Sequence, residues 1–170
     1  MSAWSGPTLR AVDTEDRELL YRIYASTRVE EMAQVPWTDQ QKENFLRFQF
    51  HAQHAYYQEH FPKAHFDLII VDEEPVGRLY LDVRDDEHRL IDIALLPEHR
   101  GRGLGTALLR KVLEAAAVEG KKVRIHVEFN NPAMRLYQRL GFHKIEEQGV
   151  YHLMEWRPDT RMAATGGKEQ

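Results

Sequence analysis

The segment PEHRGRGLGTALL, residues 97–109, gathers three glycines and three cationic or imidazole side chains directly before an apolar helical pattern. The amino end of a helix presents unpaired backbone N–H groups and a partial positive charge, so it is suited to hold a phosphate. Glycine lets a ligand approach the backbone closely and permits the positive φ angles that turn successive N–H groups inward. The segment therefore predicts a phosphate cradle. Its glycines and arginines are Gly101, Gly103, Gly105, Arg100 and Arg102.

Two familiar phosphate loops do not fit this segment. The P-loop ends in Gly-Lys followed by Ser or Thr, and no such tripeptide occurs in the sequence. The dinucleotide fingerprint Gly-x-Gly-x-x-Gly fails as well, because these glycines are spaced two by two and position 106 is Thr. A glycine-rich turn without a ligand is the remaining alternative.

The elements that must position the cradle follow from hydrophobic periodicity and capping signals. Strands are expected at residues 8–12, 66–72, 75–84, 89–96, 122–127, 142–148 and 150–156, and the second to fourth of these should form an antiparallel meander. One helix should start from an N-cap at Asp13 or Thr14 and end near position 28, and a second should run from an N-cap at Thr38 to Pro62. Two more should follow the glycine segment to position 119 and cover 131–140.

Two of these helices have a predicted apolar stripe. On the second helix, the residues at three- and four-residue steps are Phe45, Phe48, Ala52, Ala55 and Tyr56. On the third, they are Leu104, Leu108, Val112 and Ala115. Alternating strands and helices predict a mixed α/β domain over residues 1–158, followed by a disordered tail at 159–170.

Composition limits the classes of function. The chain has 170 residues, 42% of them hydrophobic, and a net charge of −4, so it lacks the overall basic field that draws proteins to nucleic acid. It has no cysteine, which excludes disulfides, thiolate metal sites and a cysteine nucleophile. No apolar run approaches the ~20 residues of a membrane span, and no signal peptide is apparent, so a cytoplasmic protein without a membrane partner is expected.

Two segments resemble the GNAT superfamily of acyl-CoA-dependent N-acyltransferases. Residues 100–105, RGRGLG, match its Arg/Gln-x-x-Gly-x-Gly/Ala motif, and NNPAMRLYQRLGF at 130–142 is similar to its Asn…Ala…Leu-Tyr…Leu-Gly-Phe segment. The resemblance covers residues 8–156. It implies a mixed, mostly antiparallel sheet of six to seven strands with about four helices, splayed between the fourth and fifth strands.

The resemblance also implies acetyl-CoA as co-substrate and no metal. The pyrophosphate would bind the main-chain amides of residues 100–105, including Leu104, with the Thr106 hydroxyl nearby. Backbone groups of the fourth strand would pair with the pantetheine arm, and the matching positions are Ala94, Leu95 and Leu96. The family asparagine matches either Asn130 or Asn131, with Asn131 preferred, and the family alanine matches Ala133.

For catalysis, the resemblance implies direct attack by a neutral amine on the thioester. Tyr137 matches the family tyrosine that protonates the departing thiolate, and a buried packing tyrosine is its structural alternative. Asp92, a charged residue inside an apolar strand, is the leading candidate for the base, although a salt-bridged Asp92 fits the sequence equally well. Glu128 and His126 are further candidates for the base.

The acceptor would lie against the first two helices and the last strands. Candidates for lining its pocket are Trp37, Phe45, Tyr80, Tyr151 and His152, and Arg78 or Asp82 could fix a charged group. The polar residues of 77–83 alternate with apolar ones, which predicts one polar strand face. This face either points toward the acceptor or is solvated or ion-paired. His51 and His54 are expected to be surface residues and not metal ligands.

The expected acceptor is a small-molecule amine, an amino acid, or a protein amine. Homodimers are frequent in the family, so a homodimer is also considered. The alternative function is a non-catalytic CoA-binding regulatory domain that keeps the cradle but has no turnover.

Overall fold

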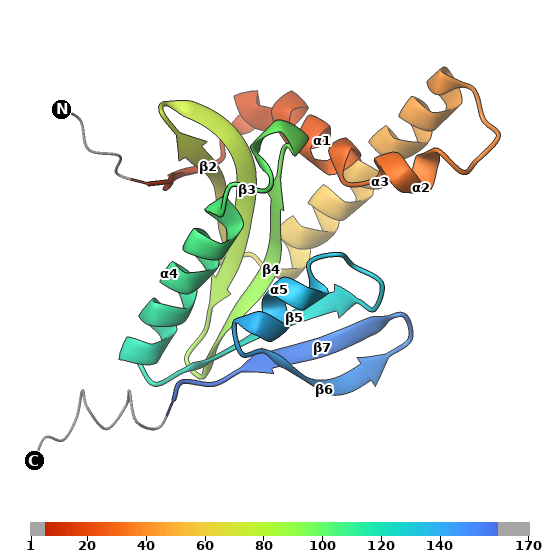
Figure 1. The fold of residues 1–170 in the computed structure, drawn as a ribbon. Coiled ribbons are helices and arrows are strands. Elements are labelled where there is room, and N and C mark those ends of the chain that lie inside the picture. The colour runs from red at the N-terminus through yellow and green to blue at the C-terminus, as the bar shows by residue number, and fades with distance from the viewer. Residues whose placement is uncertain (1–5, 160–170) are drawn as a thin grey trace, which may run out of the picture. The chain divides into compact units, whose positions relative to one another are not determined.

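The computed structural model describes residues 6–159, which form two compact units (Figure 1). Unit 1 contains the described residues up to Leu79 together with Ile93–Arg102. Unit 2 contains Tyr80–Asp92 and the described residues from Gly103 onward. The expected tail, apart from Asp159, lies outside the described residues, and the assignment of 1–158 to a single domain stays a prediction.

Within residues 6–159, seven strands form one mixed sheet with the order β1-β2-β3-β4-β5-β7-β6. The strands are β1 (Thr8–Ala11), β2 (His65–Val71), β3 (Glu74–Val83), β4 (Glu87–Leu95), β5 (Lys122–Glu128), β6 (His143–Gln148) and β7 (Tyr151–Trp156). This confirms the predicted mixed sheet, and β2, β3 and β4 are neighbours as the meander required.

The described helices are α1 (Arg17–Ser26), α2 (Val29–Met32), α3 (Asp39–His60), α4 (Leu104–Val118) and α5 (Met134–Arg139), with 3-10 turns at Thr14–Asp16 and Pro97–His99. The short α2 was not predicted. The predicted N-caps are confirmed: Asp13 caps the turn before α1, and the Thr38 hydroxyl accepts from the Gln41 amide at 3.1 Å. The start predicted for α5 was too early, since the turn around Pro132 precedes Met134.

Unit 1 is built around the contact of α1 with α3. Both Tyr21 and Tyr24 of α1 place their rings against Phe50 of α3, with centroid separations of 5.9 and 6.0 Å. In the same unit, β1 pairs antiparallel with β2 from Thr8–Ile70 to Ala11–Asp67. These aromatic contacts hold α1 against α3.

The apolar stripe predicted for α3 was wrong. Phe48 is 72% exposed and Tyr56 is 52% exposed, whereas the buried residues of the helix are Leu46 and Phe50. The helix carries aromatic residues on several sides, so helical periodicity allowed more than one face to be chosen as the buried one. The tertiary contact with α1 selected the face that contains Phe50.

In unit 2, the strands β5, β7 and β6 are neighbours in the sheet, and the same unit contains α4 and α5. Strand β5 pairs antiparallel with β7 along Val123–Glu128, and α4 contacts β5. The buried residues of α4 are Leu104, Leu108, Leu109, Val112, Leu113 and Ala116. Ala115, which was assigned to the stripe, is exposed instead.

Strand β4 pairs parallel with β5, and α4 provides the crossover between them. The register runs from Glu87–Lys122 to Leu90–Ile125, although β4 continues to Leu95 and β5 to Glu128. A pairing confined to the first residues of both strands agrees with the expected divergence of the fourth and fifth strands.

Candidate cofactor and catalytic site

The glycine segment takes the conformation that a phosphate cradle requires. Gly101 and Gly103 have φ angles of 76° and 81°, and Gly103 is the left-handed N-cap of α4. The first helical hydrogen bond runs from the Ala107 amide to the Gly103 carbonyl at 3.0 Å. No side chain of the described chain caps this helix end, so its first N–H groups are left for another partner.

Gly105 differs from the other two glycines. Its φ is not positive, it lies in the first turn of α4, and a Cβ built on it would meet nothing within 4 Å. Neither backbone conformation nor packing within the described residues therefore demands glycine here. Glycine inside a helix costs roughly 0.5–1 kcal/mol relative to alanine. A ligand that approaches the helix end closely would account for the missing side chain.

The two arginines of the segment are used differently. Arg100 donates from Nε to the Leu95 carbonyl at 2.9 Å and from Nη2 to the Ser26 hydroxyl at 3.1 Å, all within unit 1. Its guanidinium therefore anchors the start of the loop to β4 and α1. Arg102 is exposed and makes no hydrogen bond or ion pair with another described residue, so it is the arginine left to attract an anion.

The end of β4, which includes the predicted pantetheine positions Ala94, Leu95 and Leu96, is held by β3. The Leu96 amide donates to the Val76 carbonyl at 2.8 Å. A Cβ on Gly77 would lie 2.3 Å from the Ala94 carbonyl oxygen, so only glycine at position 77 lets β4 take this path. Sequence reasoning missed this residue, and an isolated glycine inside a strand was the available signal.

Tyr137 lies on α5 in unit 2 and is 4% exposed. Its ring meets Phe142 edge-on, with centroids 5.6 Å apart, and the Phe142 amide donates to the Tyr137 carbonyl. Burial raises the pKa of the Tyr137 phenol, and the negative charge of Asp92 raises that pKa further. The phenol is therefore protonated at neutral pH, as a proton donor must be.

Asp92, in the same unit, lies on β4 beyond the residues that pair with β5 and is partly buried. Its charge acts on Tyr137, so the structure brings these two predicted catalytic residues close together. The pairing of a protonated phenol with a carboxylate fits an acid and a base with separate roles.

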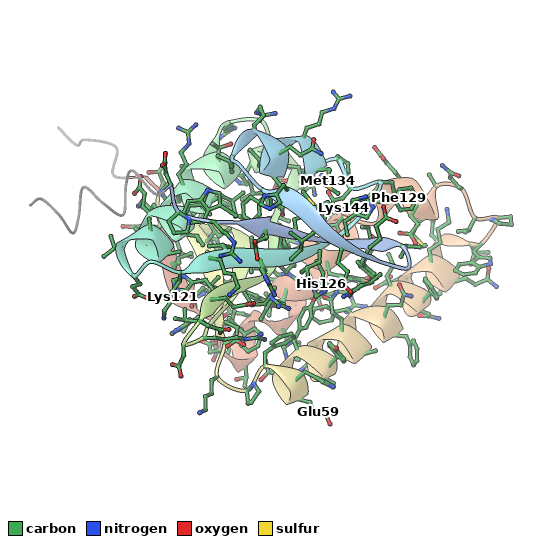
Figure 2. The ribbon with its side chains drawn as sticks, turned by 90° about the horizontal axis from the view of Figure 1, so that it is seen from below. Glu59, Lys121, His126, Phe129, Met134 and Lys144 are labelled. Carbon is green, nitrogen blue, oxygen red and sulfur yellow. The ribbon has the colours of Figure 1, made fainter. Side chains whose placement is uncertain are left out.

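The other two candidates for the base lie on β5. The pKa of His126 is lowered by partial burial of the imidazole and by the positive charge of Arg89. Glu128 is the last residue of the strand and lies opposite Tyr151 of β7. Figure 2 labels His126 within β5, together with Lys121 just before the strand and Phe129 just after it.

The two candidates for the family asparagine, Asn130 and Asn131, differ in their local contacts. The Asn131 side-chain oxygen accepts from the Ala133 amide at 2.8 Å, and the Met134 amide donates to the Asn131 carbonyl at 3.0 Å. Asn130 is exposed in the same turn. Asn131 thus shapes the turn that leads into α5, although the N-cap of the helix is Ala133.

The acceptor candidates are divided between the two units. The rings of Trp37 and Phe45 meet edge to face in unit 1, with centroids 5.1 Å apart, and Trp37 is 40% exposed. Tyr80 is buried in unit 2, whereas Tyr151 and its neighbour His152 lie at the start of β7, with Tyr151 exposed.

The polar face of β3 is ion-paired at Asp82, as one of the predicted alternatives requires, and it is buried at Arg78. Arg78 is 3% exposed and donates to the Gln53 side chain of α3 at 3.0 Å. Asp82 accepts from Arg84 Nε at 2.8 Å. The alternation was correct, but β3 is a central strand and is covered on both sides along residues 76–80.

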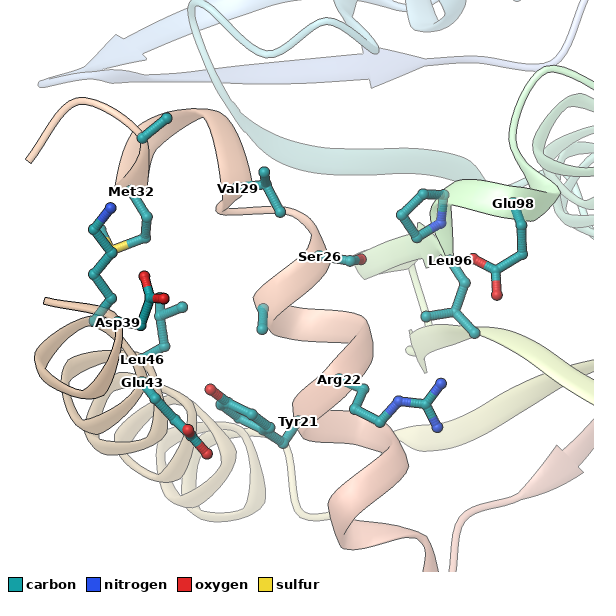
Figure 3. A pocket seen from close by; sticks show the side chains of 14 residues that line it. Tyr21, Arg22, Ser26, Val29, Met32, Asp39, Glu43, Leu46, Leu96 and Glu98 are labelled. Carbon is teal, nitrogen blue, oxygen red and sulfur yellow. The ribbon is translucent and has the colours of Figure 1, made fainter.

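Unit 1 contains a pocket of about 690 Å³ that the sequence did not reveal (Figure 3). Its apolar lining includes Met32, Leu46 and Leu96, and its charged lining includes Arg22, Lys42 and Glu98. Three helices and the segment after β4 contribute residues that are far apart in the sequence. The only local signal was the helical spacing of Arg22, Ala25 and Ser26 beside the buried side of α1.

Residues 6–159 contain neither a group of metal-binding side chains nor a helix that could span a membrane. No cluster of three or more His, Asp or Glu side chains is arranged to hold a metal ion there. His51 is exposed, and its Nδ1 lies 3.0 Å from Arg17 Nη2. None of the helices in this range is both long enough and apolar enough to span a membrane.

The fold places the chain in a known structural class. A PaiA N-acetyltransferase from Thermoplasma acidophilum, solved with coenzyme A, superposes with a TM-score of 0.68 at 18% identity, over 89% of this chain and 99% of that one. The ribosomal-protein-S18-alanine N-acetyltransferase of Escherichia coli gives 0.60 at 20% identity, over 89% and 93%. The fold is that of the GNAT acetyltransferases.

Sequence comparison identifies the family. The model of the acetyltransferase (GNAT) family matches residues 20–142, so the chain belongs to this family. A putative [ribosomal protein bS18]-alanine N-acetyltransferase of Bacillus subtilis is 28% identical over 135 residues, which are 78% of each chain. A bovine thialysine N-epsilon-acetyltransferase is 33% identical over 79 residues, which are 45% of this chain and 46% of the bovine one. The chain thus matches about half the length of this second relative.

Proposed function

We propose that the protein transfers an acetyl group from acetyl-CoA to a primary amine by direct attack of the amine. Membership in the family and relatives named as N-acetyltransferases support this class of reaction. The observation that carries the proposal for this chain is Gly105. It is a helical glycine that neither conformation nor packing within the described residues requires, located where a diphosphate would approach.

The residues at the start of α4 fit the diphosphate of coenzyme A. Gly103 opens the helix in the left-handed conformation, no side chain of the described residues caps its amides, and Gly105 leaves the space above them free. The neighbouring Thr106 hydroxyl adds a donor. When bound, acetyl-CoA supplies the activated acyl group, and the backbone of Ala94–Leu96 would hold the pantetheine arm through main-chain hydrogen bonds.

Two side chains of unit 2 would move the protons. Most amines are protonated at neutral pH, so a base must remove a proton before attack. We assign that role to the Asp92 carboxylate. The Tyr137 phenol, kept protonated by burial and by the Asp92 charge, would donate its proton to the departing sulfur. Asn131 would hold the turn that carries Tyr137.

For the acceptor, we infer that the pocket of unit 1 receives an amine that also carries polar groups. Its volume of about 690 Å³ lies in the range of small-molecule sites. Asp39 and Glu98 offer negative charge for an ammonium group, and Arg22 and Lys42 offer positive charge for a carboxylate. Ser26 lines the pocket, and its hydroxyl accepts a hydrogen bond from Arg100 of the proposed cofactor loop.

Release of free CoA from acetyl-CoA should be measured across pools of amines that include amino acids, polyamines and short peptides. Calorimetric titration with CoA should be run in parallel. We expect CoA to bind and at least one pool to accelerate its release. Tight CoA binding without release in any pool would instead support the regulatory domain, and failure to bind CoA would refute both functions.

A further inference from the structure

The helix α3 of unit 1 has a side that no other described residue covers. Its buried residues are Leu46 and Phe50, and Phe48, two residues from each, lies about 200° away around the helix. On that side, exposed residues recur at three- and four-residue steps over four turns. We call this set the outer face of α3: Asn44, Phe48, Ala52, Ala55, Tyr56 and Glu59, the last of which is labelled in Figure 2.

The outer face of α3 is aromatic and uncharged along its middle. Phe48 is 72% exposed and Tyr56 is 52% exposed. Among Lys, Arg, Asp and Glu, positions 44–58 hold only Arg47, which donates from Nη2 to Glu18 of α1 at 3.0 Å and so faces away from this side. A helix face that stays in water normally carries charges, and a contiguous exposed apolar patch marks a contact surface.

The shape of the outer face is complementary to itself. Ala52 and Ala55 form a shallow gap between the larger side chains of Phe48 and Tyr56. When two α3 helices are placed antiparallel around a twofold axis between positions 51 and 52, Phe48 of each copy faces Ala55 of the other. Both positions lie about 5 Å from that axis along the helix. Small residues at such a contact allow helix axes to approach to about 8 Å.

The polar ends of the outer face fit the same antiparallel arrangement. Gln40 Nε2 donates to the Asn44 side-chain oxygen at 2.9 Å, so the Asn44 amide nitrogen keeps its donors for another group. Glu59 makes no hydrogen bond or ion pair with another described residue. The register described above places Asn44 opposite Glu59 of the second copy, a donor opposite a carboxylate. The two Glu59 charges then lie roughly 22 Å apart along the helices, whereas parallel helices would bring them together.

We propose that the outer face of α3 binds the same face of a second copy, so that the protein forms an antiparallel homodimer through this helix. Such an interface is isologous, which is the commonest arrangement of homodimers. An aromatic side chain buries about 150–250 Å², so the four partly exposed rings of two copies contribute roughly 500 Å². The polar residues along this helix of about 33 Å bring the total to the lower end of the range for specific interfaces. We therefore expect the dimer to dissociate in the micromolar range.

Sedimentation velocity of the full chain measures its mass against concentration. We expect a shift from 20.0 kDa toward twice that mass between low micromolar and millimolar concentrations. Phe48→Lys should raise the dissociation constant at least about tenfold, because its ammonium group would be buried against Ala55 of the second copy. Val118→Lys is the matched control, since it adds the same charge at a position that is 88% exposed at the end of α4. It should leave the dissociation constant unchanged, and thermal unfolding of both variants checks that the fold is kept.

Single cysteines test the register, because the sequence contains no cysteine of its own. Ala52→Cys should form a disulfide-linked dimer on oxidation with diamide, since position 52 lies beside the proposed axis and Cα atoms within about 7 Å can be bridged. Asn44→Cys is exposed on the same face and should not cross-link, because its two copies would lie roughly 22 Å apart along the helices.

A wild-type chain that stays monomeric up to millimolar concentration would overturn the second copy as the occupant of this face. Binding of the apolar dye bis-ANS to that monomer, but not to Phe48→Lys, would then assign the face to a different protein. A dimer that survives Phe48→Lys, or that cross-links through Asn44→Cys as readily as through Ala52→Cys, would refute this interface. These measurements need neither coenzyme nor amine, so their failure is distinct from a failure of the proposed acetyl transfer.

Discussion

The pocket of unit 1 and the proposed catalytic residues of unit 2 differ in how the sequence specifies them. In unit 2, the start of α4 and Tyr137 lie within short motifs that are readable along the sequence. In unit 1, residues from α1, α2, α3 and the segment after β4 meet around a pocket, and no motif connects them. The proposed catalytic residues thus lie within local motifs, whereas the proposed acceptor pocket depends on the packing of distant segments.

The two regions also differ in how they hold charge. Asp92 and Tyr137 lie close enough for the carboxylate to raise the pKa of the phenol, so the protonation states of this pair are fixed by their surroundings. In the unit 1 pocket, three charged side chains make no hydrogen bond or ion pair with other described residues: those of Arg22, Lys42 and Glu98. Charges of this second kind can pair with a ligand without first breaking internal bonds.

The largest effect is expected for Tyr137→Phe. Removing a positioned proton donor should lower kcat by at least about 10²-fold, while CoA affinity changes little. Steady-state kinetics and calorimetry on the same preparation measure the two quantities. Equal losses in both would show that Tyr137 is a packing residue, and unit 2 would then lose its catalytic character.

A pH titration checks the environment of the same phenol. Because the pKa of Tyr137 is raised in the folded state, its contribution to stability is fully present below about pH 10 and is lost as the pH rises above the pKa of the unfolded tyrosine. Between pH 10 and the pH at which the protein unfolds, Tyr137→Phe should therefore lose less stability than the wild type. Urea titrations at each pH measure the free energy of unfolding of both proteins.

Gly77→Ala tests whether β4 depends on its close contact with β3. The added Cβ would lie 2.3 Å from the Ala94 carbonyl, so the strand must shift, at a cost of about 1–3 kcal/mol in the free energy of unfolding. CoA affinity should fall together with stability, because Ala94–Leu96 would hold the pantetheine arm. Gly149→Ala, in the β6–β7 turn, is the comparison for a glycine whose constraint is its φ of 63° alone, and it should cost stability without loss of CoA affinity.

Gly105→Ala should separate ligand binding from folding. Alanine is the better helix former and has free space in the fold, so we expect stability to rise by roughly 0.5–1 kcal/mol. Affinity for CoA should fall about tenfold, because the methyl group would occupy the approach to the first amides of α4. A variant that gains stability and keeps full CoA affinity would refute the cradle.

The smallest effect is expected in the unit 1 pocket. Arg22→Gln and Lys42→Gln should each raise KM for a carboxylate-bearing acceptor about three- to fivefold and leave kcat and CoA affinity unchanged, since exposed charge pairs contribute little. Gln40→Ala, on the same helix as Lys42 but outside the pocket lining, is the control. Unchanged KM values in both arginine and lysine variants would place the acceptor elsewhere.

Much of the fold could be predicted because its signals are local. The Thr38 cap, the start of α4 after Gly103 and the pair of final strands each depend on a few neighbouring residues. The buried face of α3 could not be predicted, because the choice of Phe50 over Phe48 depends on Tyr21 and Tyr24 of another helix. Arg78 gave no local sign that it would be buried against Gln53.

The sequence alone determined the family, the glycine segment that starts α4 and the place of Tyr137 on a short helix, because spacing along one chain defines where a helix begins and which residues it contains. Only the tertiary structure decided that the charge of Asp92 acts on Tyr137 and that Gly77 gives β4 its path. Electrostatic and steric effects depend on distance in space, and residues far apart in the chain become neighbours only when the strands and helices pack.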